Sequence, residues 1–382
     1  MFNDRLISRR GILRLGCTTA AMNCVGGRLM SNRAGAIEQT NGFEGVPQAI
    51  EESVQSGQVK AAVMMVRHRD AEASWAFGEA VSADSVFLLA SITKPMVATA
   101  VMTLCDSGDL RLDDPVDAFL PDFRGENRSQ VTIRHLLSHC SGLPDQLLDN
   151  RQLRSSHAGL AEFVESAMRV PLAFLPGSKF LYSSMGILLA SEIAARVSGM
   201  PMPRLIQERV FAPLEMQTAS LGTGGRPLST LMKCQTEHAA AEAGAGGADS
   251  SSWDWNSPYW RDLGAPWGGA HGSASDVVKF LADFLQPSGK VLKPATLVEM
   301  VTRQFSPAVT SRGLGFGLGR SNSSRYCSHD ALGHTGSTGT LAWADPKSQA
   351  ICVVLTTLPG GVVDPHPRQV ASDEFAKRIR QQ

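Results

Sequence analysis

The sequence lacks the features that define several broad classes of protein. Its 382 residues include 36 basic and 36 acidic side chains, so the formal net charge is zero. A balanced chain has no electrostatic reason to bind nucleic acid or an anionic membrane surface. No uninterrupted apolar run is long enough to span a bilayer. With 43% hydrophobic residues, the chain can instead bury a large core, in one compound domain or in two modest ones.

Cysteine is scarce, with seven in the whole chain. Two of them fall within the first 36 residues, and the others are Cys105, Cys140, Cys234, Cys327 and Cys352. An odd number at irregular spacing does not describe a disulfide framework or a zinc site. We therefore expect buried free thiols, and one disulfide bridge remains open as an alternative.

Several well-known catalytic motifs are also missing. There is no Gly-x-Ser-x-Gly elbow, which argues against an α/β-hydrolase. His135 and His139 stand four residues apart, but the residues between them lack the glutamate of the His-Glu-x-x-His zinc motif. The glycine-rich segment 313–317 follows no strand–helix unit suited to a dinucleotide. The sequence thus predicts neither a metal ion nor a cofactor.

The first 36 residues are typical of an export signal. Arg9 and Arg10 precede a mildly apolar stretch at 15–27, and Ala-Gly-Ala at 34–36 offers a small-x-small cleavage site. A disordered basic tail is the alternative, because polar residues interrupt the apolar stretch. The order of the three features favours a twin-arginine signal, and it predicts a periplasmic or secreted protein whose folded domain spans 37–382.

Residue periodicity predicts an α+β fold. Strands are expected at 61–66, 74–77, 339–345 and 350–356, and helices at 46–56, 91–105, 160–168, 185–197, 276–285 and 368–380. Strands near both ends and helices between them predict one antiparallel sheet built from both chain ends and flanked by helices. The sheet region covers about 43–105 and 270–382, and the inserted, mostly helical region covers about 106–269.

Two neighbouring segments of the helical region have unusual compositions. Residues 238–252 are dominated by Ala, Gly and Ser, which predicts a mobile surface loop. Residues 253–267 contain four tryptophans and a tyrosine, which predicts core that anchors loops, with pocket lining as the alternative.

The first candidate for chemistry is Ser91-Ile92-Thr93-Lys94. On a helix the first and fourth positions share a face, so the Ser91 hydroxyl and the Lys94 amine can touch. Pro95 is tolerated if the helix begins near Ser91, where free N–H groups favour an alkoxide and can donate to an oxyanion. A desolvated, neutral Lys94 amine could accept the serine proton. A surface pair on an ordinary helix is the alternative, because chance produces about one such motif in a chain of this length.

Two further segments could complete a site. Tyr182-Ser183-Ser184 offers a phenol that can relay protons, although a core tyrosine is the alternative. In the segment 333–337, His334 and Thr335 could hold a substrate carboxylate or carbonyl, and the Ser337 N–H could be a second oxyanion donor. Gly336 and its neighbours allow a ligand to approach the backbone, although a plain glycine-rich strand entry is the alternative.

Ser91-x-x-Lys94, Tyr182-x-Ser184 and His334-Thr335-Gly336, in this order, resemble the motifs of the β-lactamase-related serine hydrolases. This family includes class C β-lactamases, D-alanyl-D-alanine peptidases, D-aminopeptidases and family VIII esterases. The similarity covers about residues 43–360 and also includes 112–116, 132–139 and 211–216. It implies a β-lactamase/transpeptidase-like fold and a two-step acyl transfer. Ser91 would be the nucleophile, Lys94 and Tyr182 would manage its proton, and the N–H groups of Ser91 and Ser337 would hold the oxyanion.

Two departures from the family pattern narrow the expected substrates. The second motif usually ends in Asn, whose amide contacts the acyl side chain of the substrate, and Ser184 offers a shorter group with one donor. His334 replaces the lysine common in β-lactamases, so we expect carboxylate binding to weaken as the pH rises. Short esters or D-amino-acid amides are the predicted substrates. A β-lactamase, and a weakly hydrolytic penicillin-binding sensor of peptidoglycan fragments, are the alternatives, whereas no feature supports a purely structural cell-wall protein.

Overall fold

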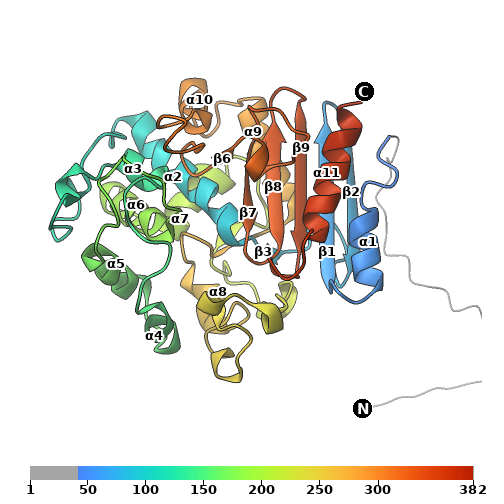
Figure 1. Cartoon of the computed structure of the whole chain (residues 1–382), viewed down its shortest axis with the longest axis horizontal. Coiled ribbons are helices and arrows are strands. Elements are labelled where there is room, and N and C mark those ends of the chain that lie inside the picture. The colour runs from blue at the N-terminus through green and yellow to red at the C-terminus, as the bar shows by residue number, and fades with distance from the viewer. Residues whose placement is uncertain (1–41, 382) are drawn as a thin grey trace, which may run out of the picture. The chain divides into compact units, whose positions relative to one another are not determined.

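The computed structural model describes residues 42–381, so the predicted export segment lies outside the described residues. A six-stranded antiparallel sheet with the order β2-β1-β9-β8-β7-β6 is its main element (Figure 1). Val63 in the N-terminal strand β1 pairs with Leu355 in the C-terminal strand β9. This pairing confirms the prediction of an α+β fold with a sheet formed from both chain ends. The strands are β1 (Ala61–His68), β2 (Ala71–Gly78), β6 (Gly317–Leu318), β7 (Leu332–Gly336), β8 (Thr340–Asp345) and β9 (Ala350–Thr356).

Both faces of the sheet are covered, which explains why β1 is apolar at almost every position. Alternate side chains of a strand point to opposite faces. Val63 and Met65 belong to the larger core, which lies on the side of α9, whereas Met64 and Val66 belong to a second core beneath α1 and α11. Figure 1 shows α1 and α11 side by side over this second face. These helices are α1 (Gln48–Gln55), α9 (Ala274–Leu285) and α11 (Pro367–Ile379).

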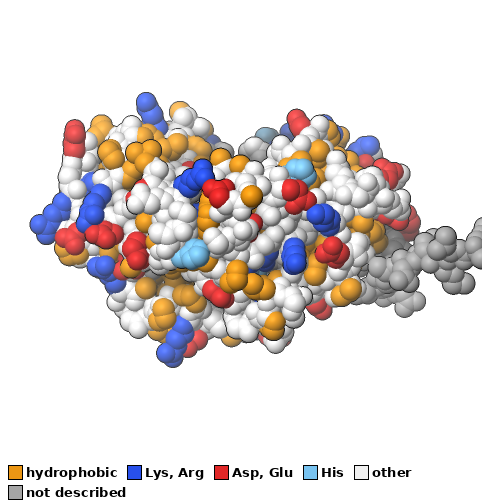
Figure 2. Space-filling view, turned by 90° about the horizontal axis from the view of Figure 1, so that it is seen from below, with side chains coloured by type: hydrophobic (Ala, Val, Ile, Leu, Met, Phe, Trp, Pro, Cys, Tyr) orange, Lys and Arg blue, Asp and Glu red, His pale blue; other side chains and the backbone are white. Residues whose placement is uncertain are grey.

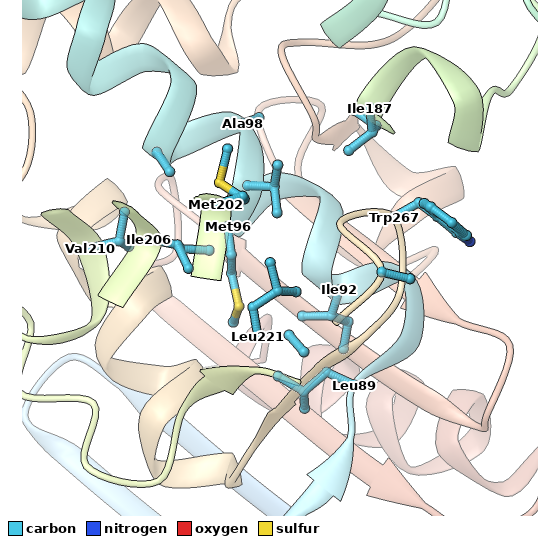
Figure 3. Packing of buried hydrophobic residues seen from close by; sticks show 14 of the residues in the cluster. Leu89, Ile92, Met96, Ala98, Ile187, Met202, Ile206, Val210, Leu221 and Trp267 are labelled. Atoms are coloured by element: carbon cyan, nitrogen blue, oxygen red, sulfur yellow. The ribbon is translucent and has the colours of Figure 1, made fainter. Parts of the chain in front are cut away.

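The region between the two sheet-forming parts is mostly helical and is organised around α2 (Thr93–Ser107). The first twelve residues of α2, from Thr93 to Leu104, are all buried, which is the pattern of a helix enclosed on every side. Figure 3 shows Leu89, Ile92, Met96 and Trp267 among the apolar side chains around the start of this helix. The other helices are α3 (Ile133–Leu137), α4 (Asn150–Ser155), α5 (Leu160–Arg169), α6 (Ser184–Ser198), α7 (Met202–Ile206), α8 (Pro258–Leu263) and α10 (Pro294–Val301).

A small three-stranded sheet lies beside the start of α2. Its order is β3-β5-β4, and its strands are β3 (Phe87–Leu88), β4 (Ser220–Leu221) and β5 (Ala270–Gly272). The Leu89 N–H donates to the Ala270 carbonyl, and the Ala270 N–H donates to the Thr93 hydroxyl. These bonds tie both sides of the nucleophile segment to β5.

The segment 238–252 differs from the prediction of a simple surface loop. It contains the short 3-10 helices Ala241–Ala243 and Ala248–Ser250, and the side chains of Ala243 and Ser250 are buried. Small residues permit this close packing: a side chain on Gly244 would come within 2.2 Å of the Ser250 Cβ atom. The segment is therefore partly built into the core.

The described residues agree with the expectation of free thiols, because Cys105, Cys140, Cys234, Cys327 and Cys352 form no disulfide.

None of the helices that the structure describes is both long and apolar enough to cross a membrane. On the face shown in Figure 2, acidic and basic side chains are interspersed, in keeping with the balanced composition.

Candidate active site

Ser91 and Lys94 are in direct contact. Ser91 lies in a 3-10 turn, Ala90–Ile92, that leads into α2, and the Lys94 Nζ is 2.9 Å from the Ser91 Oγ. Lys94 also donates to the Trp267 carbonyl at 2.7 Å, and its side chain is only 1% exposed. A buried amine held by one carbonyl and one serine hydroxyl is well placed to exchange a proton with that hydroxyl.

The backbone next to Ser91 is held in an unusual conformation. Ala90 has a φ of 49°, in the left-handed region that residues with a side chain seldom adopt. Such strain persists only where the surroundings hold it, and it is concentrated at functional sites. Pro95 lies in the first turn of α2, where its missing N–H removes no helical hydrogen bond.

Tyr182 connects the first and third motifs. It lies in the loop just before α6, and the Lys94 Nζ is 4.8 Å from the centre of its ring. Its hydroxyl is 3.5 Å from the His334 Nε2. The phenol therefore lies between the buried amine and strand β7, where it could pass a proton to or from a substrate.

His139 supports Tyr182 from within the protein. The two rings are 4.7 Å apart between centres, and the His139 Nδ1 accepts a hydrogen bond from the Ser183 N–H. Burial, with the positive charges of Arg312 and Lys94 as lesser causes, holds the pKa of His139 well below its ordinary value. A neutral imidazole can accept this bond, so His139 positions the loop that carries Tyr182.

The end of β7, the turn after it and the start of β8 are fastened against the backbone on the N-terminal side of Ser91. The Thr338 and Thr340 hydroxyls donate to the Leu88 and Leu89 carbonyls, each at 2.9 Å. A side chain on Gly336 would come within 2.6 Å of the Leu89 carbonyl oxygen, so only glycine permits this approach. As a result, Ser337 lies on the wall of the same pocket as Ser91.

One pocket, with a volume of about 350 Å³, brings most of the sequence-predicted residues together. Its lining includes Ser91, Tyr182, Ser184, His334, Thr335 and Ser337. Lys94 and Gly336 are buried behind this lining. The lining also contains residues that the motifs did not indicate: Asp145, Gln146, Arg154, Glu242, Trp255, Trp260, Trp267, Gly268 and Arg312, together with Leu88 and Ala90. Trp255, Trp260 and Trp267 are thus both buried in the core and part of the pocket wall. Pocket lining, the alternative interpretation of the aromatic segment 253–267, therefore also holds.

The hydroxyl of Ser184 is already engaged within the protein. Ser184 donates to the Asp145 Oδ1 from its hydroxyl at 2.6 Å and from its backbone N–H at 3.0 Å. Its single donor is therefore not free for a substrate amide. Asp145 carries no sequence signal of its own, because it is recognised only through this contact across the fold.

The expectation of a partly charged His334 is wrong. Burial, reinforced by the positive charges of Arg312 and Lys94, holds the pKa of His334 well below its ordinary value. The His334 Nδ1 faces the Thr335 carbonyl at 2.7 Å, and the Arg312 Nη1 is 3.2 Å from the His334 Nε2. These contacts fit a neutral ring with its proton on Nδ1, and they make Arg312 the cation at this end of the pocket. Arg312 stands in no motif. In the sequence it only precedes the glycine-rich segment 313–317, which does not match a dinucleotide-binding motif.

We expect the His334 ring to show no titration between about pH 6 and about pH 8, although an ordinary histidine titrates near 6.5. The affinity for a carboxylate bound beside this ring should then stay constant over that pH range. A titrating histidine cation would instead bind the carboxylate more weakly as the pH rises. The measurement is the ring ¹⁵N chemical shift against pH, with His334→Gln to assign the signal. A midpoint between about 6 and about 7 would contradict the neutral state.

Comparison with known proteins agrees with this geometry. The family model described as Beta-lactamase matches residues 46–375. Esterase EstB of Burkholderia gladioli is 31% identical over 295 residues, covering 70% of this chain and 73% of the relative. Penicillin-binding protein 4 of Amycolatopsis lactamdurans is 30% identical over 308 residues and covers 75% of both chains.

Solved structures show the same fold at lower identity. EstCE1, a hydrolase with promiscuous acyltransferase activity, superposes with a TM-score of 0.70 at 21% identity, covering 87% of this chain and 97% of its own. The D-amino acid amidase of Ochrobactrum anthropi SV3 gives a TM-score of 0.67 at 23% identity, covering 88% and 97%. With a family model matched over most of its length and two relatives of at least 30% identity, this chain belongs to the beta-lactamase family of serine hydrolases.

Proposed function

We propose that this protein hydrolyses small esters through an acyl-enzyme on Ser91, with D-amino-acid amides as a second substrate class. The observation that carries the proposal is the 2.9 Å contact between the Ser91 Oγ and the buried Lys94 amine, on the edge of a pocket. Esters come first because Ser184 has no free donor for a substrate amide. The name of the relative Esterase EstB supports the same order.

The first step is attack of the Ser91 Oγ on the substrate carbonyl. Lys94, in the form with an unprotonated amine, accepts the serine proton while it donates an N–H to the Trp267 carbonyl. The negative charge that develops on the carbonyl oxygen is held by the N–H groups of Ser91 and Ser337, and one such donor contributes on the order of 3 kcal/mol. The tetrahedral intermediate then expels the alcohol, which takes a proton through Tyr182 or Lys94.

In the second step, water attacks the acyl group on Ser91. The same groups remove a proton from the water and return one to the Ser91 oxygen as the carboxylic acid leaves. The reaction balances as ester plus water giving acid plus alcohol.

The alternatives predict different behaviour of the acyl-enzyme. A β-lactamase would turn over nitrocefin rapidly, whereas a penicillin-binding sensor would be labelled by a fluorescent penicillin and keep the label. The engaged hydroxyl of Ser184 and the neutral His334 both argue against efficient β-lactam hydrolysis.

The test is a panel of p-nitrophenyl esters, D-alanyl amides and nitrocefin on the purified protein, with Ser91→Ala as the blank. We expect short esters to be hydrolysed fastest, and mass spectrometry to find the acyl group on Ser91. Rapid nitrocefin turnover with slow ester hydrolysis would replace the proposal with a β-lactamase. A stable penicillin adduct without ester turnover would favour the sensor.

We further propose that the chain is exported through a twin-arginine signal at Arg9 and Arg10, which places the activity in the periplasm or outside the cell. Replacing both residues with lysine should retain the protein in the cytoplasm, because this type of signal is read through its arginine pair. Cell fractionation followed by immunoblotting measures the distribution. Lysine substitution of Arg111 and Arg124, far along the chain, is the control, and unchanged export of the Arg9/Arg10 variant would contradict the proposal.

A further inference from the structure

Arg154 is a buried cation without a hydrogen-bond partner for most of its donors. It lies on α4 and is 1% exposed, and its Nε and Nη1 atoms are buried without any partner. The central carbon of the guanidinium lies 3.7 Å from the centre of a ring of Trp260 in α8. An aromatic ring attracts the positive charge of a guanidinium, but it does not satisfy the N–H groups along the guanidinium edge.

A buried guanidinium with unpaired N–H groups lowers the stability of the folded protein. An unsatisfied buried donor loses its bonds to water, and the loss is larger for a charged group. Burial lowers the pKa of the Arg154 guanidinium to about 10, and the negative charge of Glu242 opposes part of this shift. The side chain is thus still a cation at neutral pH, and the described residues leave its edge without an acceptor.

Arg154 faces the active-site pocket. It lines the same cavity as Ser91, together with Trp255 and Trp260. The acidic side chains there do not satisfy it: Asp145 receives both donors of Ser184, and Glu242 leaves Nε and Nη1 without a partner. These N–H groups would be satisfied by an acceptor that a substrate brings to this end of the cavity.

The pocket has two different walls. Arg312, His334 and Thr335 form the wall along β7, whereas Asp145 and Arg154 belong to the helical region. Ser184, bonded to Asp145, occupies the position that the family resemblance gives to the acyl side of the substrate. Arg154 lines the same cavity as Ser184 and Asp145, so an acyl group that lies along Ser184 could extend toward it.

We propose that Arg154 forms an anion-binding subsite for a carboxylate at the far end of the substrate's acyl group. This subsite rests on the proposed ester hydrolysis and adds a substrate class to it, namely half-esters of dicarboxylic acids. A carboxylate can accept two parallel N–H bonds from the planar edge of a guanidinium. Trp255 and Trp260 would cover the methylene chain between the two ends.

The experiment compares mono-p-nitrophenyl adipate with its methyl ester, which has the same chain without the charge. We expect the wild-type protein to prefer the acid by about tenfold or more in kcat/KM, as a charge-assisted hydrogen bond in a buried site allows. Arg154→Met should abolish this preference. Arg151→Met is the matched control, because Arg151 lies on the same helix but is 75% exposed and paired with Asp249.

The ratio of the two substrates is the readout, since damage to the pocket would slow both. Glu242→Gln provides a second variant that does not depend on Arg154→Met folding, and it should increase the preference for the acid by removing a competing negative charge. A wild-type protein without the preference, or an Arg154→Met variant that keeps it, would overturn the subsite.

Binding to Ser91→Ala separates this proposal from the proposed function. Calorimetry should find that Ser91→Ala binds the acid about tenfold more tightly than the methyl ester. If it does while the wild-type protein hydrolyses neither, the subsite stands and the esterase proposal fails. If both compounds are hydrolysed equally and bound equally, the esterase stands and the subsite fails.

Discussion

Replacing Ser91 with alanine should lower kcat/KM for the best p-nitrophenyl ester by about 10⁴-fold or more. Within the part of the chain that the structure describes, the Lys94 amine bonds to the Ser91 hydroxyl and the Trp267 carbonyl, and the substitution removes the first of these. No covalent intermediate can then form, and the activity that remains comes from binding and the oxyanion donors alone. Initial rates and mass spectrometry of the protein after exposure to the ester measure both effects.

The matched control for this variant is Ser107→Ala, at the C-terminal end of α2, the helix that follows Ser91, and outside the pocket. It should leave the rate unchanged within about twofold, because substitutions away from special features have small effects. Ester hydrolysis by Ser91→Ala at the wild-type rate, or an acyl adduct on another residue, would rule out Ser91 as the nucleophile.

Replacing Lys94 with methionine should lower kcat by about 10²- to 10⁴-fold, the range of general acid–base catalysis. Methionine has a similar length and no polar atom, so it should fill the buried space while leaving Ser91 without a proton acceptor. Lys290→Met, on an exposed lysine, should have no effect on the rate. Thermal unfolding of both variants separates lost chemistry from lost stability.

The rate losses caused by Ser91→Ala and Lys94→Met should not be additive. Because Ser91 and Lys94 act as one unit, the double variant should be about as slow as Ser91→Ala alone. If instead Lys94→Met retained wild-type turnover, Lys94 would not be the base, and Tyr182, which lines the same pocket as Ser91, would be the next candidate.

The parts of the fold and site that the sequence predicted are those determined by local spacing. Short apolar runs located β1, β8 and β9, and the i,i+3 spacing of Ser91 and Lys94 on a helix start predicted a contact that the structure shows. The association of Tyr182 and His334 with this pair came from family resemblance, because no local pattern links residues so distant in sequence.

The rest depended on tertiary contacts that leave no local pattern. Asp145 and Arg312 matter because of what each touches, namely Ser184 and His334, and neither stands in a motif. The charge of His334 was predicted wrongly because burial and a neighbouring arginine determine it, and neither can be read from His-Thr-Gly. Arg154 stands in no motif, and in a sequence a buried arginine cannot be told from one on the surface.

The pairing of β1 with β9 has a consequence for how the protein is made. β1 leaves the ribosome early, but one of its edges has no partner until Ala350 to Thr356 have followed. An open edge of a buried, apolar strand can pair with other chains. Contacts between the two ends of a long chain also close slowly. During synthesis the protein should therefore depend on chaperones until nearly the whole chain has emerged, and truncation before Ala350 should yield an aggregating product rather than a smaller enzyme.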